Sequence, residues 1–425
     1  MTSQRKSEPY GRYGIADFPR SEHRRRVNKA QRLMHEKGVD CLILSSETNI
    51  GYFCGYRGTA SIESVDYSTA FLVLPADSDP VLVTHVSSRG NVEGMLALGR
   101  AEYLYWEGVN AEGKYPTKIL DAVVNVIREI SPSETRTIGV EMGQRLHLAV
   151  SLEILEEIRR VLNQSKIVDA SDIVWKCRMI KSDLEVDYLE KSCEITLSAY
   201  EETFDKVKEG MTEKEVAREV YKGILDGAGE DMPLKMFLNI RAGPERYTMC
   251  DTRPTERRLR KGDILILDGG FMYRGYFSDL TRLLCVGRPS KNQKELFDTA
   301  REAEELGVRR LKAGATAGKI WKDVMDFIKD RNHLKNSLYE GIGHGIGLDI
   351  HEFPRIASNS EAVLKPGMVL TMEPCLYDEP IVKGILFGGK NSGLGEGVFF
   401  VEDEVVITES GNRILGKMSR DLYEA

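Results

Sequence analysis

Two apolar runs meet around a short polar turn in the segment 262–287, which reads GDILILDGGFMYRGYFSDLTRLLCVG. This pattern predicts an antiparallel hairpin that turns within residues 273–275. The hairpin can turn at Tyr273 and Arg274 or at Arg274 and Gly275. Because side chains alternate between the two faces of a sheet, either turn places Asp268 and Asp279 on the same face. Two carboxylates side by side in a largely apolar place are costly unless a cation lies between them. The segment therefore predicts a metal site. The alternative is that Asp268 begins a local turn with the two glycines that follow it.

Candidate ligands continue downstream of this hairpin. The stretch GHGIGLDIHE holds His344 and His351, and its glycines allow an imidazole nitrogen to approach a ligand without crowding. Glu373 ends the apolar run VLTME directly before Pro374, and Glu402 interrupts the apolar run VFFVEDEVVIT. Acids within such runs are poorly explained as surface charges. The alternatives are histidines that serve only the core and, for Glu402, a place at a sheet edge where its acidic neighbours are tolerated.

Helix and strand patterns alternate in the first part of the chain. They predict helices over 21–38 and 119–130 and strands over 41–44, 71–74, 81–84 and 138–141. The second and third of these strands form a predicted hairpin. Such alternation predicts an α/β domain.

The second part of the chain has a different character. Capping boxes predict the starts of three helices, at Ser182 with Glu185, Thr212 with Glu215 and Ser290 with Gln293. β-rich stretches lie at 264–267, 271–284, 368–372 and 398–406. We therefore expect an α+β unit of helices packed on a strongly bent antiparallel sheet. A chain of 425 residues is expected to form two domains, which we place at 1–170 and 171–425.

Charge and composition narrow the classes of function. The formal net charge is -7 and the basic residues are dispersed, so we expect no nucleic-acid partner. No apolar run approaches the roughly 20 residues of a membrane helix, so we expect no membrane partner. Residues 1–26 lack the apolar stretch of a secretory signal, and the seven cysteines lie far apart, as is typical of reduced thiols. These features predict a cytoplasmic protein.

Four motifs together resemble one family. The strings DGG..YRGYFSDLTR, GHGIGLDIHEFP, LTMEP and VED.VVIT are similar to those of the creatinase, prolidase and aminopeptidase P (pita-bread) metallopeptidase superfamily. The resemblance covers most of the chain, including the R.IKS..E pattern that begins at Arg178. It implies an α/β N-terminal creatinase-like domain followed by an α+β pita-bread catalytic domain.

The resemblance also implies a set of functional residues. Carried over to this sequence, the metal ligands are Asp268, Asp279, His344, Glu373 and Glu402. Asp279 and Glu402 would be the bidentate or bridging pair. Two divalent ions per chain are implied, and ligation by many oxygens and one imidazole favours manganese over cobalt, zinc or iron. Glu373 would act as general base, and His351 would donate a hydrogen bond to the substrate carbonyl.

Two positions depart from the pattern of the proline-specific members. Asp251 stands where these enzymes usually have a histidine, and an aspartate cannot replace an imidazole in proton transfer. Phe400 stands where peptidases commonly have an arginine, so one way of holding a substrate carboxylate is lost. Both positions are predicted to contact the substrate.

The segment NIGYFCGYRG resembles a creatinase-type loop that reaches into the active site of a partner subunit. It places Tyr56 and Arg57 at the loop tip as predicted substrate-binding residues, with Arg57 clamping a carboxylate. The alternative is an exposed loop arginine. The resemblance therefore implies a homodimer.

These features favour a dinuclear metal-dependent hydrolase of an amide-type C–N bond, with an Xaa-Pro dipeptide as the default substrate. The first alternative is a non-peptidase acting on a small zwitterionic metabolite, as a creatinase-like or ectoine hydrolase-like enzyme or a dimethylsulfoniopropionate lyase. The second alternative is a catalytically inactive binding module, against which the five retained ligands argue.

Overall fold

A computed structural model describes residues 18–57, 70–104, 118–130, 135–146, 152–231, 235–249, 252–331, 333, 337, 340–387 and 395–425. The chain divides into two compact units, of which unit 1 ends at Arg178 and unit 2 begins at Met179. The sequence placed the boundary at 170/171, before helix α6 (Ser171–Arg178). The division falls after this helix because α6 packs against the first helix of unit 1.

Unit 1 is built on a mixed sheet with the order β4-β3-β2-β1-β5-β6 among the described residues. Its strands are β1 (Cys41–Leu44), β2 (Phe71–Pro75), β3 (Val81–His85), β4 (Arg100–Leu104), β5 (Thr137–Val140) and β6 (Lys166–Asp169). Strands β2 and β3 pair antiparallel, which confirms the predicted hairpin. Strand β1 is antiparallel to β2 and parallel to β5, so the sheet mixes both kinds of pairing.

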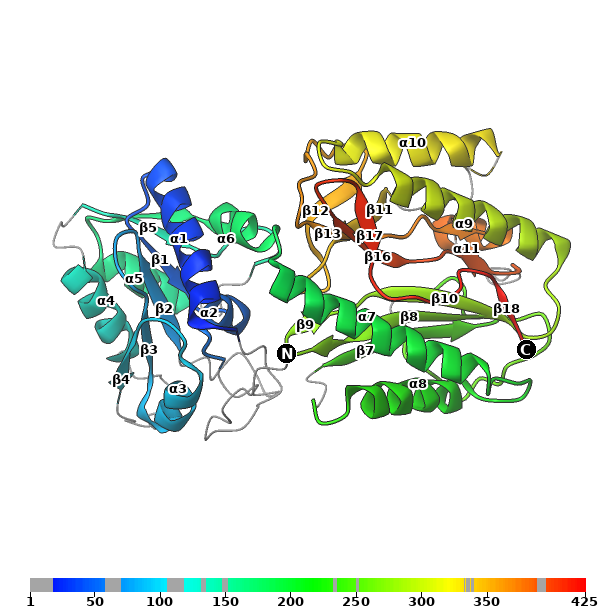
Figure 1. The fold of residues 1–425 in the computed structure, drawn as a ribbon, viewed down its shortest axis with the longest axis horizontal. Coiled ribbons are helices and arrows are strands. Elements are labelled where there is room, and N and C mark those ends of the chain that lie inside the picture. The colour runs from blue at the N-terminus through cyan, green and yellow to red at the C-terminus, as the bar shows by residue number, and fades with distance from the viewer. Residues whose placement is uncertain are drawn as a thin grey trace. The chain divides into compact units, whose positions relative to one another are not determined.

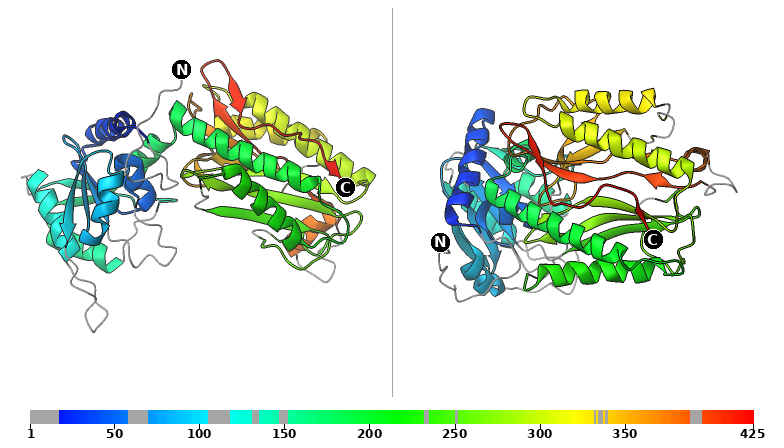
Figure 2. Two further views of the ribbon diagram at one scale, coloured as in Figure 1. Left: turned by 60° about the horizontal axis from the view of Figure 1, so that its bottom comes forward. Right: turned by 45° about the vertical axis from the view of Figure 1, so that its right-hand side comes forward.

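Helices cover this sheet. In the described part of unit 1, the helices before α6 are α1 (Arg20–Lys37), α2 (Glu47–Cys54), α3 (Arg89–Met95), α4 (Lys118–Ile130) and α5 (Leu152–Val161). Apolar side chains of α4 and α5 share one core cluster with the strands, and α1 lies on the other side of the sheet (Figure 2). Helix α1 ends where Gly38 takes a φ of 63°, as the sequence predicted. The α/β prediction for this unit is confirmed.

Unit 2 begins with the helices that the capping boxes predicted. Its helices among the described residues are α7 (Asp183–Phe204), α8 (Glu213–Ala228), α9 (Lys291–Arg310), α10 (Ala317–Asp330) and α11 (Glu379–Phe387). At the start of α7, α8 and α9, the Ser or Thr side chain accepts from a backbone N–H, and the Glu or Gln side chain accepts in return. All three predicted helix starts are confirmed.

The strands in the described part of unit 2 form two larger sheets and one small ribbon. They are β7 (Met236–Ala242), β8 (Ile264–Tyr273), β9 (Tyr276–Phe277), β10 (Leu280–Cys285), β11 (Gly341–Gly345), β12 (Glu352–Ala357), β13 (Val369–Met372), β14 (Leu376–Tyr377), β15 (Val398–Phe399), β16 (Asp403–Ile407), β17 (Asn412–Ile414) and β18 (Tyr423–Glu424). One sheet has the order β18-β10-β8-β7, with β9 paired to β8, and the other has the order β12-β11-β13-β16-β17. Strands β14 and β15 form the ribbon.

The two sheets of unit 2 face each other. Helices α7 and α8 flank the first sheet and α9 and α10 flank the second, with the strands between them (Figure 1). Ile266 and Leu283 from the first sheet share one core cluster with Ile342 and Leu370 from the second. The α+β prediction is confirmed, with the strands in two sheets rather than one. Within the described ranges, every helix is too short or too polar to span a lipid bilayer.

Candidate metal centre

The predicted hairpin positions the first two acids. Strand β8 pairs antiparallel with β10, and Asp268 stands opposite Thr281. The hairpin turns at Arg274 and Gly275. Asp279 precedes Thr281 by two residues, and residues two apart on a strand share a face. The two aspartates therefore lie on one face of the sheet, as the sequence predicted.

The alternative of a turn directly after Asp268 is wrong, because β8 continues through both glycines to Tyr273. The glycines serve close packing instead. A Cβ atom added at Gly270 would lie 2.3 Å from the carbonyl oxygen of Ser278. A larger residue at position 270 would collide with the backbone of Ser278, the residue directly before Asp279.

His344 comes from the opposite sheet, on strand β11. Its Nε2 lies 3.4 Å from Glu373 Oε1 and 3.9 Å from Asp279 Oδ2. Its Nδ1 lies 3.0 Å from the carbonyl oxygen of Gly345, which can only accept, so Nδ1 carries a proton and donates it. In the neutral ring, Nε2 then directs its lone pair toward the carboxylates, which is the tautomer that a metal ligand requires.

Glu373 and Glu402 lie at the ends of strands. Glu373 follows β13 directly, as predicted, and its backbone N–H donates to Ile342 of β11. The prediction that Glu402 lies inside a strand is wrong, because β15 ends at Phe399 and β16 begins only at Asp403. Glu402 instead forms an isolated bridge with Thr281, and this bridge joins the two sheets. The Thr281 hydroxyl also donates to Glu402 Oε2 at 3.1 Å.

The five predicted ligand residues come together at this junction. Ligand atoms within 4.8 Å of one another occur in three groups, which are Asp279 with His344 and His351, His344 with Glu373 and Glu402, and Asp268 with Asp279 and Glu402. Their function as ligands stays a prediction.

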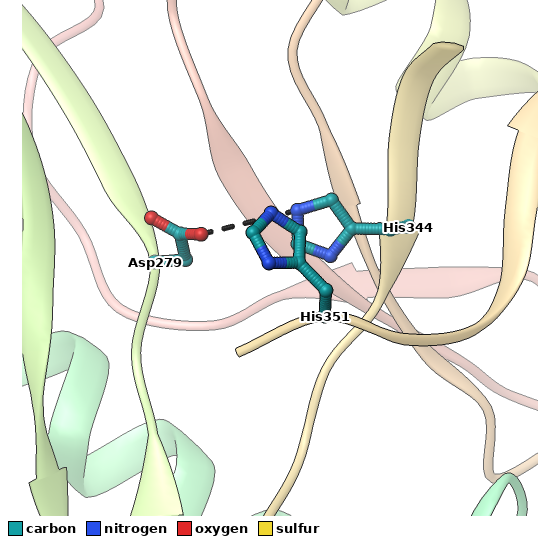
Figure 3. A group of neighbouring side chains, drawn as sticks. All are labelled: Asp279, His344 and His351. Carbon is teal, nitrogen blue, oxygen red and sulfur yellow. Dashed lines mark ion pairs between the residues drawn. The ribbon is translucent and has the colours of Figure 1, made fainter. Parts of the chain in front are cut away.

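His351 joins the first of these groups from the loop after β11. Its ring lies 4.3 Å from the ring of His344, centroid to centroid, and both rings lie next to Asp279 (Figure 3). His351 is exposed whereas His344 is buried. The position of His351 beside the cluster fits a contact with substrate.

The carboxyl groups of the cluster have raised pKa values. Burial and the neighbouring carboxylates Asp268, Glu373 and Glu404 raise the pKa of Asp279 well above its ordinary value. Burial, Asp279, Glu373 and Asp268 do the same for Glu402. Desolvation and Asp268 raise the pKa of Glu373 to about 8. The carboxylates therefore repel one another in the absence of a cation.

Two carboxylate oxygens give a direct test of whether metal ions fit. Asp279 Oδ1 and Glu402 Oε1 are buried and find no hydrogen-bond partner among the described residues. Such orphaned acceptors are expensive in a protein interior, and divalent cations satisfy them. The residues present therefore fit the implied metal ions.

The acids that follow Glu402 have structural functions. Glu404 is buried, and its Oε1 accepts the backbone N–H of Asp279 at 2.8 Å. Asp403 is buried in an ion pair with Arg282, with Nη2 and Oδ1 2.7 Å apart. The alternative of acids on a sheet edge is therefore wrong for this segment. Three consecutive acids in an apolar run were the signal that the sequence offered.

A buried ion pair supports the loop that carries His351. Lys181 Nζ lies 2.9 Å from Glu352 Oε2, and both side chains are almost fully buried. The other oxygen of Glu352 accepts from the backbone N–H groups of Leu348 and Asp349. The sequence analysis identified Lys181 only as part of a motif and missed this function.

The structure describes three of the four predicted substrate-binding residues. Tyr56 and Arg57 are buried, and a Cβ atom at Gly51 would lie 2.6 Å from Arg57 Cγ, so the Arg57 stem packs on α2 rather than extending from an exposed loop. Phe400 is 4% exposed and belongs to the core cluster of unit 2, which favours a packing function. Asp251 lies outside the described residues. Binding of substrate by these four residues stays a prediction.

Comparison with family models identifies the class of protein. Residues 187–409 match metallopeptidase family M24, and residues 26–180 match the creatinase/prolidase N-terminal domain. The first match spans more than half of the chain, so the chain belongs to metallopeptidase family M24. The predicted combination of a creatinase-like α/β domain and a pita-bread catalytic domain is confirmed.

Individual relatives agree with this assignment. The chain is 28% identical over 400 residues to an Xaa-Pro dipeptidase of Pyrococcus furiosus, covering 93% of this chain and 99% of the relative. It is similar to the structure of a dipeptidase from Pyrococcus horikoshii OT3, with a TM-score of 0.76, 26% identity and coverage of 94% and 100%. A prolidase structure from Thermococcus sibiricus gives a TM-score of 0.78 at 23% identity, covering 95% and 99%, and shows the fold alone. The chain is a hydrolase of the metallopeptidase type with candidate metal-binding groups.

Proposed function

We propose that this protein is a dinuclear metal-dependent hydrolase that cleaves an amide-type C–N bond, with Xaa-Pro dipeptides as its first candidate substrates. The observation that carries the proposal is the largely buried cluster of acids around His344, in which Asp279 and Glu402 each have an oxygen without a partner among the described residues. The relative from Pyrococcus furiosus, named as an Xaa-Pro dipeptidase, supports the choice of substrate.

Two divalent cations would be held by the five clustered side chains, Asp268, Asp279, His344, Glu373 and Glu402. When bound, they would supply Lewis acidity that polarises the scissile carbonyl and acidifies water. The oxygen-rich donor set favours manganese.

Other steps of the proposed reaction depend on side chains of the protein, which transfer the proton, bind the substrate and orient the metal ligands. Glu373 accepts the proton of the attacking water as the general base. His351 lies beside Asp279 and donates a hydrogen bond to the oxygen of the scissile carbonyl. Thr281 and Glu404 hold Glu402 and Asp279 in place.

A second candidate is hydrolysis or lysis of a small zwitterionic metabolite. Asp251 and Phe400 favour it, because they replace a histidine and an arginine of the proline-specific pattern. An inactive binding module is less well supported, since all five donor side chains are present and close together.

The assembly and the compartment are part of the same proposal. A homodimer follows from the resemblance of residues 49–58 to a loop that serves a partner subunit, with Arg57 binding a carboxylate there. A cytoplasmic location follows from the composition. Sedimentation at micromolar concentration tests the dimer, and a monodisperse monomer would contradict it.

The decisive experiment is to reconstitute the purified protein with manganese, cobalt, zinc or iron and assay Xaa-Pro dipeptides and zwitterionic osmolytes in parallel. We expect about two metal ions per chain and release of proline. Glu373→Gln should lower kcat at least about 100-fold, since it removes the base. Turnover of an osmolyte alone would favour the second candidate, and failure to bind any metal would favour the binding module.

A further inference from the structure

Arg241 lies on the sheet face that carries the metal-ligand acids. Strand β7 pairs antiparallel with β8, with Asn239 opposite Asp268 and Arg241 opposite Ile266. Directly opposed residues share a face, and so do residues two apart on one strand. Arg241 is therefore a diagonal neighbour of Asp268. Diagonal neighbours are about 7–8 Å apart, which a long side chain spans.

Arg241 is buried, with 4% of the residue exposed, and its Nε finds no hydrogen-bond acceptor among the described residues. Across the part of the chain that the structure describes, we find no ion pair that would compensate its charge. Arg282, which is buried in the same unit, is instead paired with Asp403. A buried cation without a compensating anion is costly, so an anion bound beside Arg241 would be stabilised.

The ligand acids do not need this cation when metals are bound. Two divalent cations carry four positive charges, and Asp268, Asp279, Glu373 and Glu402 carry four negative ones, so they cancel. A substrate carboxylate would bring the missing negative charge, and a guanidinium binds a carboxylate in a bidentate manner. Phe400 is apolar and lies in the core, so it offers no competing charge.

We propose that Arg241 is a specificity-determining residue that binds the free carboxylate of the substrate beside the metal centre. The inference rests on the proposed function and narrows it to small substrates with a free carboxylate, whether dipeptides or zwitterionic metabolites. A substrate whose carboxylate is amidated binds without this contact.

The test compares binding of L-proline and L-prolinamide to the manganese-loaded protein by calorimetry. Arg241→Met should weaken L-proline binding about 10- to 100-fold, as expected for loss of a charge-assisted contact. Binding of L-prolinamide and the metal content should stay within about twofold. Arg241→Lys keeps the charge without the planar fork and should lie in between, which also covers the case that the methionine variant fails to fold.

Arg355 provides a matched control, because it stands opposite the candidate ligand His344 on the neighbouring strand β12 but is exposed to solvent. Arg355→Met should leave L-proline binding within about threefold. The proposal is overturned if Arg241→Met weakens both ligands equally, or if Arg355→Met causes the selective loss. If no dipeptide is hydrolysed but L-proline binding still depends on Arg241, the proposed peptidase activity fails while the carboxylate site stands.

Discussion

At the scale of single residues, two candidate ligands are oriented by hydrogen bonds with neighbouring side chains. The Thr281 hydroxyl donates to Glu402 Oε2, and Glu404 accepts the backbone N–H of Asp279. Such supporting contacts orient a ligand before the metal binds, and their loss typically costs 10- to 100-fold in affinity. Asp279 and Glu402 are thus oriented by two buried residues, Glu404 and Thr281.

Replacing Thr281 with valine keeps the shape of the side chain and removes the donor. We expect Thr281→Val to weaken metal binding about 10- to 100-fold, as measured by competition with a chelator. Thr203→Val is a suitable control, since Thr203 is also buried and donates only to the Ala199 carbonyl within α7. Equal metal affinity in both variants would show that Thr281 does not orient Glu402.

Asp251 leads to a prediction about substrate charge. If this aspartate binds a cationic group, substrates with an amine, amidine or onium near the scissile bond should be preferred over neutral Xaa-Pro dipeptides. Asp251→Asn should then lower kcat/KM for cationic substrates several-fold without loss of metal, and Asp251→His should raise dipeptidase activity. An unchanged substrate profile in Asp251→Asn would mean that Asp251 is only a structural acid.

At the scale of elements, the loop between β11 and β12 is held by the Lys181–Glu352 pair. Removing one partner of a buried pair leaves the other charge uncompensated, which costs about 3–5 kcal/mol. We expect Lys181→Met to destabilise unit 2 by about this amount and to lower kcat, because the loop that carries His351 loses its support. Chemical denaturation and steady-state assays measure the two effects.

Lys206→Met is the control for this prediction. Lys206 pairs with Glu219 at a similar distance of 2.9 Å, but both side chains are partly exposed. Exposed pairs contribute little to stability, so this variant should unfold almost like the parent. If both variants lose the same stability, burial of the Lys181–Glu352 pair does not matter.

At the scale of the whole molecule, metal binding and stability are linked. The pKa of Glu373 is about 8 in the folded metal-free protein, compared with an ordinary value of 4.5. Between these pH values the folded state binds more protons than the unfolded state, so the free energy of unfolding should fall as pH rises. Bound cations keep the carboxylates ionised and should remove this fall. Metal at about 100 times its Kd should add about 2.7 kcal/mol per site.

Scanning calorimetry from about pH 5 to about pH 8, with and without chelator, measures this linkage. The transition of unit 2 should shift to lower temperature with rising pH only in the chelated sample. The transition of unit 1, which lacks the five ligand residues, is the internal control. A metal-free transition that moves to higher temperature over this pH range would contradict the electrostatic account of the cluster.

Local patterns in the sequence determined which elements form and which residue types supply the ligands. The helix starts at Ser182, Thr212 and Ser290 follow from contacts within four residues, and the shared face of Asp268 and Asp279 follows from the parity of a hairpin. Both are short-range rules that a sequence displays directly.

Only the tertiary structure decided which charges are partnered. Glu404 meets the backbone of Asp279 across 125 positions, and Lys181 meets Glu352 across 171, so neither pair has a local signature. The same holds for Glu402, which lies where two sheets meet, and for Arg241, whose Nε finds no acceptor in the part of the chain that the structure describes. The spacing of residues along the chain predicts a face of a strand, but the cost of burying a charge depends on the partners that the complete fold brings to it.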